Sequence, residues 1–280
     1  ALDVYEYMLS NNSQTGLIDQ ISQRSELMFA GTIPVTYNDA GGYTFFYVPK
    51  ILVQSLGAAE RKFLDVIASL NSGNFDEKLF QIAKNDLQTS FKQRLASVNG
   101  RGRMIGRAFN LGRTWESYLT YPDQIASVTK EDLMRVGKQY FGKDRMKFIS
   151  RTGISKKNKL KKPPYKPTVT DQKESSAYAQ RFEQIPALPF NPRFIDFDKE
   201  IVQAALPGGH QLYVSQNEAN DLFNMLLKFK IGRFAEPRVS VLSNILKQAG
   251  AGDFDRFAFK REIAVAGVKY YIWSDGNFLT

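Results

Sequence analysis

The stretch LMFAGTIPVTYNDAGGYTFFYV, residues 27–48, decides the fold class, because it predicts two antiparallel strands joined by a turn. Leu27–Tyr37 and Tyr43–Val48 are rich in the β-branched and aromatic residues that favour strands. The segment Asn38-Asp39-Ala40-Gly41-Gly42 between them consists of residues that favour turns. A hairpin of this kind needs further elements to cover its apolar face.

Helical periodicity surrounds this hairpin. Apolar residues recur every three or four positions, which predicts helices over 2–10, 15–23, 57–70, 75–97, 103–111 and 115–121. Gly100 and Gly102 are expected to interrupt the pattern between two of these helices. Another helix is expected to start at Thr129, whose hydroxyl can accept a hydrogen bond from the backbone N–H of Asp132. Met146–Arg151 is expected to form a closing strand. The fold class is therefore α+β, an antiparallel sheet with helices packed on one face.

A proline- and lysine-rich stretch divides the chain. It includes six lysines between Lys156 and Lys166, which favours a solvated, extended linker. Beyond it, strands are expected over 201–206, 211–215 and 222–231, followed by a helix over 236–249. Pro207-Gly208-Gly209 is expected to turn the first pair of strands as a hairpin. The predicted domains are 1–152, a linker over 153–193, and a partial second copy over 194–280. The chain starts at Ala1 inside a helical pattern, so we expect a piece of a longer protein.

Several chemistries are excluded by composition. The chain has one histidine, His210, and no cysteine, whereas a catalytic zinc typically needs three His, Cys, Glu or Asp ligands. His210 follows a glycine pair and is expected to be a turn or strand-edge residue. The sequence contains neither a Gly-x-Ser-x-Gly elbow nor a P-loop. We therefore expect no catalytic residue and no metal ligand in this chain. The sequence also contains no run of about 18 apolar residues, the length that could span a membrane.

The order of several segments resembles the second, non-catalytic domain of the insulinase–pitrilysin family of zinc metallopeptidases. The resemblance covers residues 1 to about 151, and its specificity lies in the order and spacing of these segments. The segments are 9–12, 15–20, 70–76, 83–87, 101–104, 121–125 and 128–133. After the linker, Leu206–Val214 resembles the hairpin that opens each domain of the family, which implies that a third domain begins here.

The resemblance also implies which helix of this chain corresponds to the zinc-binding helix of the family. In the catalytic domain of this family, a helix carries His-x-x-Glu-His, with both histidines on one face. The comparable helix places Ser240, Ser243 and Asn244 at those positions, and none of them can replace the family's ligands. These residues are therefore interpreted as degenerate counterparts of the zinc motif. The resemblance implies a parent protein of four related domains that enclose a chamber, with zinc bound upstream and no cofactor in this segment.

Three functional hypotheses follow. The first is a non-catalytic, substrate-enclosing segment of a zinc endopeptidase, with peptide substrates and the upstream catalytic domain as partners. The second is an inactive family member that acts as a structural or assembly subunit. The third is a nucleic-acid or anionic-surface binder that works through Lys156–Lys166. The net charge of +10 suggests this hypothesis. We rank it last, because these lysines fit a linker. A homo-oligomer is left open, and the resemblance allows a bacterial periplasm or cell envelope.

Overall fold

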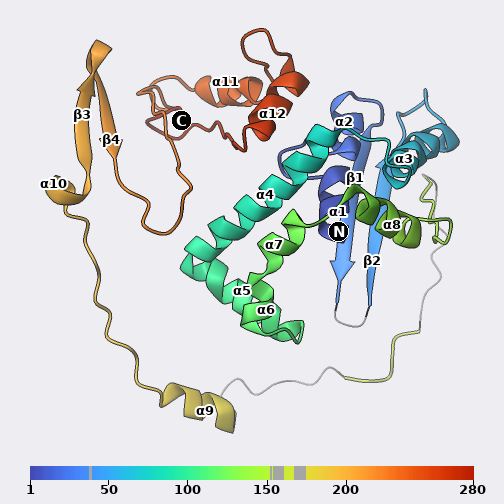
Figure 1. Cartoon of the computed structure of the whole chain (residues 1–280), viewed down its shortest axis with the longest axis horizontal. Coiled ribbons are helices and arrows are strands. Elements are labelled where there is room, and N and C mark those ends of the chain that lie inside the picture. The colour runs from blue at the N-terminus through green and yellow to red at the C-terminus, as the bar shows by residue number, and fades with distance from the viewer. Residues whose placement is uncertain (38–39, 152, 154–160, 167–174) are drawn as a thin grey trace. The chain divides into compact units, whose positions relative to one another are not determined.

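The computed structural model describes residues 1–37, 40–151, 153, 161–166 and 175–280, and it contains two compact units. Unit 1 combines Ala1–Arg145 with Asn217–Thr280, and unit 2 is Met146–Gln216. Each described hairpin is a two-stranded antiparallel sheet, and helices supply most of the remaining regular structure. The predicted α+β class is confirmed (Figure 1).

Unit 1 contains most of the elements. In its N-terminal segment they are α1 (Leu2–Leu9), α2 (Leu17–Gln23), β1 (Phe29–Thr36), β2 (Gly41–Val48), α3 (Leu56–Asn71), α4 (Glu77–Ala96), α5 (Val98–Asn110), α6 (Trp115–Leu119), α7 (Tyr121–Ala126) and α8 (Lys130–Tyr140). In its C-terminal segment they are α11 (Val239–Leu246) and α12 (Arg256–Val265). In the described ranges, none of these helices has both the length and the apolar character that crossing a membrane requires.

The first hairpin forms as the sequence predicts. Its register pairs Phe29 with Val48 and Thr36 with Gly41. Alternate residues of β2, namely Tyr43, Phe45 and Tyr47, pack against the helical core. Since successive side chains of a strand point to opposite faces, the helices cover one face of the sheet, as expected.

Helix α1 supplies much of the core. Val4, Tyr5, Met8 and Leu9 are almost fully buried. The Tyr5 ring stacks on Phe141 at 4.5 Å between centroids, just beyond the end of α8. The start of α8 is fixed by the predicted cap, because Thr129 accepts from the Asp132 N–H at 3.2 Å and the Asp132 carboxylate accepts from the Thr129 N–H.

The predicted break at Gly100 and Gly102 is wrong. Both glycines lie inside α5, and the chain turns at Ser97, whose backbone is extended. The Ser97 hydroxyl caps α5 by accepting from the Gly100 N–H at 2.9 Å. A Cβ on Gly100 would overlap the Arg94 carbonyl oxygen, so this glycine permits the tight corner between α4 and α5.

Two predicted strands are absent from the structure. Met146–Arg151 has no strand pairing, although its Phe148 and Ile149 favour a strand. A strand needs a partner for its backbone groups, and this segment has none among the described strands. Leu222–Ile231 is also not a strand, and only Phe229 forms a bridge, with Leu279. Helices α7 and α12 were not predicted as separate elements.

Unit 2 is built around the second predicted hairpin. Its elements are α9 (Ala177–Glu183), α10 (Phe197–Glu200), β3 (Val202–Leu206), η1 (Pro207–Gly209) and β4 (His210–Val214). Gly208 and Gly209 turn the hairpin with φ of 80° and 77°, values that favour glycine. Residues 156–160, the first part of the predicted lysine-rich run, lie outside the described residues. The division into 1–152, 153–193 and 194–280 stays a prediction.

Candidate functional site

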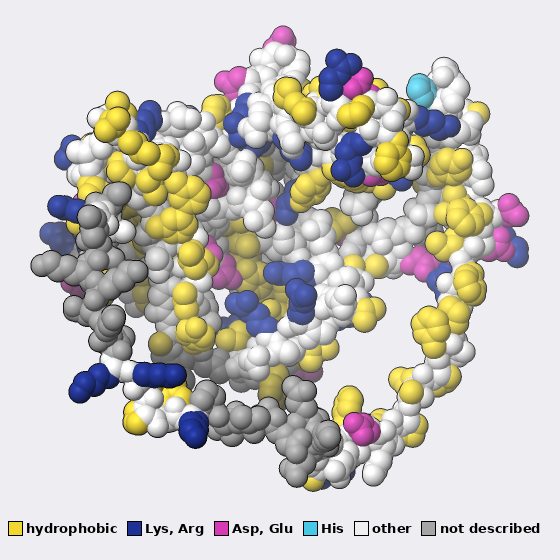
Figure 2. Space-filling model, turned by 180° about the vertical axis from the view of Figure 1, so that it is seen from behind, with side chains coloured by type: hydrophobic (Ala, Val, Ile, Leu, Met, Phe, Trp, Pro, Cys, Tyr) yellow, Lys and Arg dark blue, Asp and Glu magenta, His cyan; other side chains and the backbone are white. Residues whose placement is uncertain are grey.

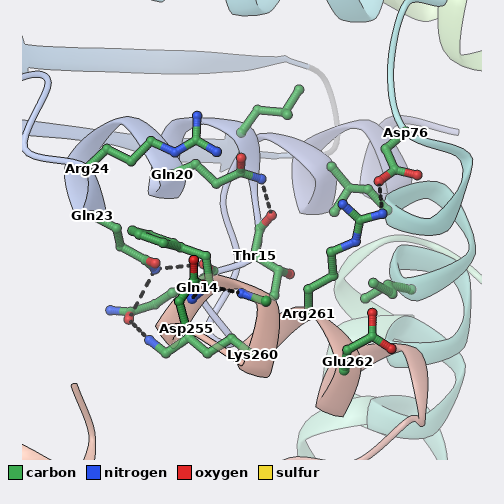
Figure 3. Close-up of a pocket in the computed structure, with 15 residues that line it drawn as sticks. Gln14, Thr15, Gln20, Gln23, Arg24, Asp76, Asp255, Lys260, Arg261 and Glu262 are labelled. Atoms are coloured by element: carbon green, nitrogen blue, oxygen red, sulfur yellow. Dashed lines mark hydrogen bonds and ion pairs between the residues drawn. The ribbon is translucent and has the colours of Figure 1, made fainter. Parts of the chain in front are cut away.

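A cleft of about 580 Å³ lies within unit 1, between α2, the start of α4 and α12 (Figure 3). Its lining combines charged and amide side chains with a few apolar ones. The charged members are Arg24, Asp76, Asp255, Lys260, Arg261 and Glu262, and the amides are Gln14, Gln20 and Gln23. The two sides of the cleft come from distant parts of the sequence, since Gln14 and Lys260 are 246 positions apart.

The α2 side of the cleft is held by hydrogen bonds to the carboxylate of Asp19. Its carboxylate accepts from the backbone N–H groups of Asn11 at 2.9 Å and Gly16 at 3.1 Å, and from the Ser10 hydroxyl at 2.7 Å. A Cβ on Gly16 would overlap Leu9, so glycine lets the chain pass close to α1. The loop before α2 is therefore rigidly positioned at the cleft.

The α12 side is organised by its own cap. Asp255 accepts from the backbone N–H groups of Phe257 and Ala258 at 2.8 and 2.9 Å. One helical turn later, Lys260 donates from Nζ to Gln14 Oε1 at 2.7 Å. Arg261 forms an ion pair with Asp76, which caps α4 (Figure 3). These contacts join α12 to α2 and α4.

Burial shifts two ionisable groups here. It lowers the pKa of Lys260, and the nearby charge of Arg256 lowers it further, while Asp19 opposes both. Burial also raises the pKa of Asp19, although the hydrogen bonds from Ser10, Asn11 and Gly16 act in the opposite direction. Among the described residues that line the cleft, none is a serine, histidine or cysteine. The cleft can therefore hold polar groups, but its lining supplies no hydroxyl–imidazole or thiolate nucleophile.

The predicted counterparts of the zinc motif all lie on α11, outside this cleft. Ser240 Oγ donates to the Pro237 carbonyl at 3.0 Å, and Ser243 Oγ donates to the Ser240 carbonyl at 2.9 Å. Asn244 is exposed and accepts from Lys247 Nζ at 3.2 Å. The two hydroxyl groups thus bond to the backbone of their own helical turn. This donor set does not fit a zinc ion, which takes imidazole, carboxylate or thiolate ligands.

His210 is exposed and begins β4 in unit 2, which agrees with a strand-edge position. Within the described ranges, no group of three or more His, Cys, Asp or Glu side chains is arranged to hold a metal ion. The structure therefore brings together none of the predicted positions as a metal centre.

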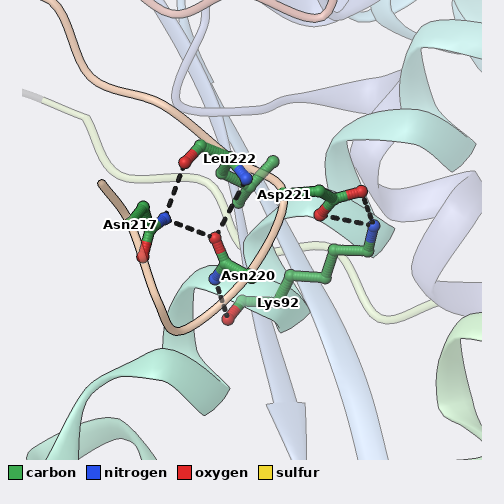
Figure 4. A network of polar contacts seen from close by, with 5 residues as sticks. All are labelled: Lys92, Asn217, Asn220, Asp221 and Leu222. Atoms are coloured by element: carbon green, nitrogen blue, oxygen red, sulfur yellow. Dashed lines mark hydrogen bonds and ion pairs between the residues drawn. The ribbon is translucent and has the colours of Figure 1, made fainter. Parts of the chain in front are cut away.

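A second polar network joins α4 to the start of the C-terminal segment (Figure 4). Lys92 Nζ contacts both carboxylate oxygens of Asp221, at 3.0 and 2.9 Å. Asn220 organises the loop by accepting from the Leu222 N–H at 3.0 Å and from Asn217 Nδ2 at 2.8 Å. The Lys92 ammonium lowers the pKa of Asp221 by hydrogen bonding to its carboxylate.

A third, more buried network lies closer to the start of α4. Lys269 Nζ contacts Asp86 at 2.6 Å and donates to Ser90 Oγ at 3.1 Å. The Tyr7 hydroxyl donates to the other Asp86 oxygen at 2.6 Å. Sequence reasoning missed both networks, because a lysine and an aspartate far apart in sequence carry no local signal that they will meet.

Comparison with known proteins adds little. No family model and no curated protein matches this sequence. Among solved structures, the chain is similar to the periplasmic protease PqqL from Escherichia coli, with a TM-score of 0.37 and 11% identity. The match covers 98% of this chain and 33% of that protein, so this chain spans about a third of its length. A likeness at this level leaves the function open, and the proposals below rest on the residues of this chain.

Proposed function

We propose that this chain is a non-catalytic, substrate-enclosing segment of a longer zinc endopeptidase that degrades peptides. The zinc site and the catalytic residues are expected in a domain upstream of Ala1. The proposal starts from the resemblance of residues 1 to about 151 and of Leu206–Val214 to the insulinase–pitrilysin family. In this role the chain contributes walls and peptide contacts, and it performs no step of the hydrolysis.

The observation that carries the proposal is the chemistry of α11. Ser240 and Asn244 stand four positions apart, on one face of the helix, where the family resemblance places two histidines. Ser240 and Ser243 direct their hydroxyls to backbone carbonyls of the same turn. A serine hydroxyl in this state is neither a zinc ligand nor a general base. The absence of ligand chemistry at the positions that the resemblance assigns to the motif supports a non-catalytic role.

The two-stranded sheets support a role in holding peptides. Within the described residues, β1 and β2 pair only with each other, so each strand has one edge without a strand partner. An extended peptide can add to such an edge through main-chain hydrogen bonds. A wall of this kind binds peptides with little dependence on their side chains.

The test measures zinc and hydrolysis on the purified chain. Zinc content after equilibration with zinc and gel filtration is expected to be far below one ion per chain, and a quenched fluorescent peptide is expected to remain uncut. Tightly bound zinc near one ion per chain, together with hydrolysis that a chelator abolishes, would overturn the proposal.

A matched variant shows that the assay can detect zinc on this helix. Ser240→His with Asn244→His places two imidazoles on one face of α11, the arrangement that zinc-binding helices use. We expect this double variant to bind zinc at micromolar concentrations by calorimetry, while the wild type shows no heat of binding. Ser243 is left unchanged because it is buried.

A further inference from the structure

A strongly basic surface occupies the corner between α4 and α6. From Leu87 to Trp115 the chain contains no acidic residue, whereas six cationic side chains fall in this stretch. They are Lys92, Arg94, Arg101, Arg103, Arg107 and Arg113, and all six are exposed. The positive charge of the protein is therefore not confined to the lysine-rich linker.

Most of these cations form no ion pair with the described residues. Lys92 pairs with Asp221, and Arg101 Nη1 donates to the carbonyls of Leu95 and Ala96 at 3.1 Å each. In the part of the chain that the structure describes, no ion pair is recorded for Arg94, Arg103 or Arg113. Arg107 has no ion pair there either, and its charge acts on the half-buried Glu6 only through space.

An apolar stripe lies on the same helix. Val98, Ile105 and Phe109 are 76%, 53% and 82% exposed. Their spacing of seven and four positions places them on one face of α5. Met104 and Ala108, on the neighbouring face, are buried. The described residues thus leave this part of the apolar face of α5 exposed. Figure 2 shows how commonly apolar side chains reach the surface on one side of the molecule.

We propose that this surface, made of the stripe Val98/Ile105/Phe109 and the arginines 101, 103, 107 and 113, binds acidic peptide segments that also carry apolar side chains. Charge complementarity selects the acidic partner, since the stretch offers only positive charge. An α-helix is about 10–12 Å wide, and the screening length at physiological salt is about 8 Å. This width exceeds the screening length, so the arginines on the far side of α5 act on a peptide that crosses the helix rather than on one that lies along the stripe. An extended 12-residue peptide, at about 3.3 Å per residue, is long enough to contact both.

Two other anionic partners fit the geometry less well. On a helical wheel Arg103 and Arg107 point away from the stripe, so inserting the stripe into a membrane would hold these arginines away from the lipid headgroups. Single-stranded nucleic acid requires aromatic platforms for its bases. Two of the three stripe residues, Val98 and Ile105, are aliphatic, and the Trp115 ring is already stacked on Tyr118 at 6.1 Å. The stripe is suited to the side chains of a peptide.

Binding of acidic peptides rests on the proposed function, because such peptides are substrates only if the chain is part of a peptidase. Its test is separate, because binding is measured without zinc or hydrolysis. If zinc and hydrolysis are absent but the acidic peptide does not bind, only the present inference fails. If the chain binds zinc and cuts peptides, the proposed function fails whatever the peptide binding shows.

The experiment measures fluorescence anisotropy with the whole chain. The probe is a labelled 12-residue peptide of four glutamates, four leucines and four serines, and the control probe has lysine in place of each glutamate. We expect the acidic probe to bind at least tenfold more tightly than the basic one. Its affinity should fall as salt is raised, because salt screens exposed charges.

Matched variants locate the binding. Arg103→Gln/Arg107→Gln/Arg113→Gln is expected to weaken binding about tenfold, the sum of three exposed charge contacts. Lys161→Gln/Lys162→Gln/Lys166→Gln removes the same charge from the linker and is expected to change binding less than twofold. Ile105→Ser/Phe109→Ser is expected to weaken binding at least threefold, since it removes only the apolar contacts. All of these positions are exposed, so equal melting temperatures are expected.

Three results would overturn the inference. The first is an equal loss in the arginine and lysine variants, which would assign binding to net charge alone. The second is no loss in the Ile105→Ser/Phe109→Ser variant. The third is that an oligouridylate or vesicles of anionic lipid bind the chain more tightly than the acidic probe does and lose binding in the arginine variant. That outcome would assign the surface to a nucleic acid or a membrane.

Discussion

Gly137 shows how a single residue sets the packing of the core. It is buried on α8, where α8 meets α3 and α1. A Cβ at this position would overlap Asn71 Oδ1 and come within 2.8 Å of Tyr5 Cε2. Asn71 Oδ1 also accepts the hydrogen bond from the Tyr5 hydroxyl at 2.8 Å, so the neighbours of Gly137 are themselves held in place. Glycine is needed here for space, not for backbone freedom.

Replacing Gly137 by alanine is therefore expected to lower the free energy of unfolding by roughly 1–3 kcal/mol, the usual cost of overpacking a core. The same change at Gly106 on α5, where a Cβ meets nothing within 4 Å, is expected to raise it by about 0.5–1 kcal/mol. Urea denaturation of both variants measures the two effects. Stabilisation by Gly137→Ala would contradict the close approach.

Glu6 gives a pH-dependent test at the residue scale. Burial raises its pKa above the ordinary value of 4.5, and the charge of Asp3 adds to the rise. The Tyr43 hydroxyl, which donates to Glu6 Oε2 at 3.1 Å, and the charge of Arg107 act in the opposite direction. Between pH 4.5 and the pKa of the folded state, the folded chain binds more protons than the unfolded chain. Ionisation of Glu6 thus reduces the free energy of unfolding as pH rises through this window.

Glu6→Gln removes this contribution. The free energy of unfolding of the variant minus that of the wild type should therefore increase as the pH rises through the window. Chemical denaturation at a series of pH values between about 4 and 8 measures the difference. Taking the difference cancels the titration of all other groups, and a flat or falling difference would contradict the raised pKa.

At the scale of elements, two of the ion pairs that join the C-terminal segment to α4 differ in burial. The side chains of Lys269 and Asp86 are 25% and 18% exposed. Lys92 and Asp221 are 47% and 70% exposed. Water screens the second pair more strongly, so the first should contribute more to stability.

Double-mutant cycles compare the two pairs. The cycle of Asp86→Asn and Lys269→Gln is expected to give a coupling of about 1.5–3 kcal/mol, as for hydrogen bonds to charged groups. The cycle of Lys92→Gln and Asp221→Asn should give less than about 1 kcal/mol. Equal couplings would mean that burial does not distinguish these contacts. The second cycle serves as the control, because both pairs join the same two segments.

At the scale of the whole molecule, unit 1 is built from two segments separated in sequence by unit 2. The described residues of unit 2 are exposed or half-exposed throughout. Trypsin is therefore expected to cut first at Lys161, Arg181 or Arg193, and later within α1 to α8, because buried helical backbone is not accessible to a protease.

The nicked protein tests the composition of unit 1. We expect the N-terminal fragment to co-elute with the fragment that contains α11 and α12 on gel filtration, because the contacts of Lys260, Arg261 and Lys269 join them. Asp86→Asn with Asp76→Asn should promote their separation. Separation of the wild-type fragments without denaturant would show that the C-terminal segment is not part of unit 1.

The sequence by itself determined what depends on near neighbours. The hairpin at residues 29–48, the cap at Thr129 and the glycine turn at Gly208 follow from local periodicity and backbone preference. The presence of a single histidine, the absence of cysteine and the absence of acidic residues from Leu87 to Trp115 are also visible without a fold.

Only the tertiary structure decided which distant groups meet. The unpaired segment at Met146–Arg151 contains residues such as Phe148 and Ile149 that favour a strand, but strand formation depends on a partner that the sequence does not identify. Arg261 meets Asp76, and Lys269 meets Asp86, because α12 and the residues after it lie against α2 and α4. Such contacts depend on the whole chain being folded, since no local propensity acts across a separation such as the 179 positions between Lys269 and Ser90.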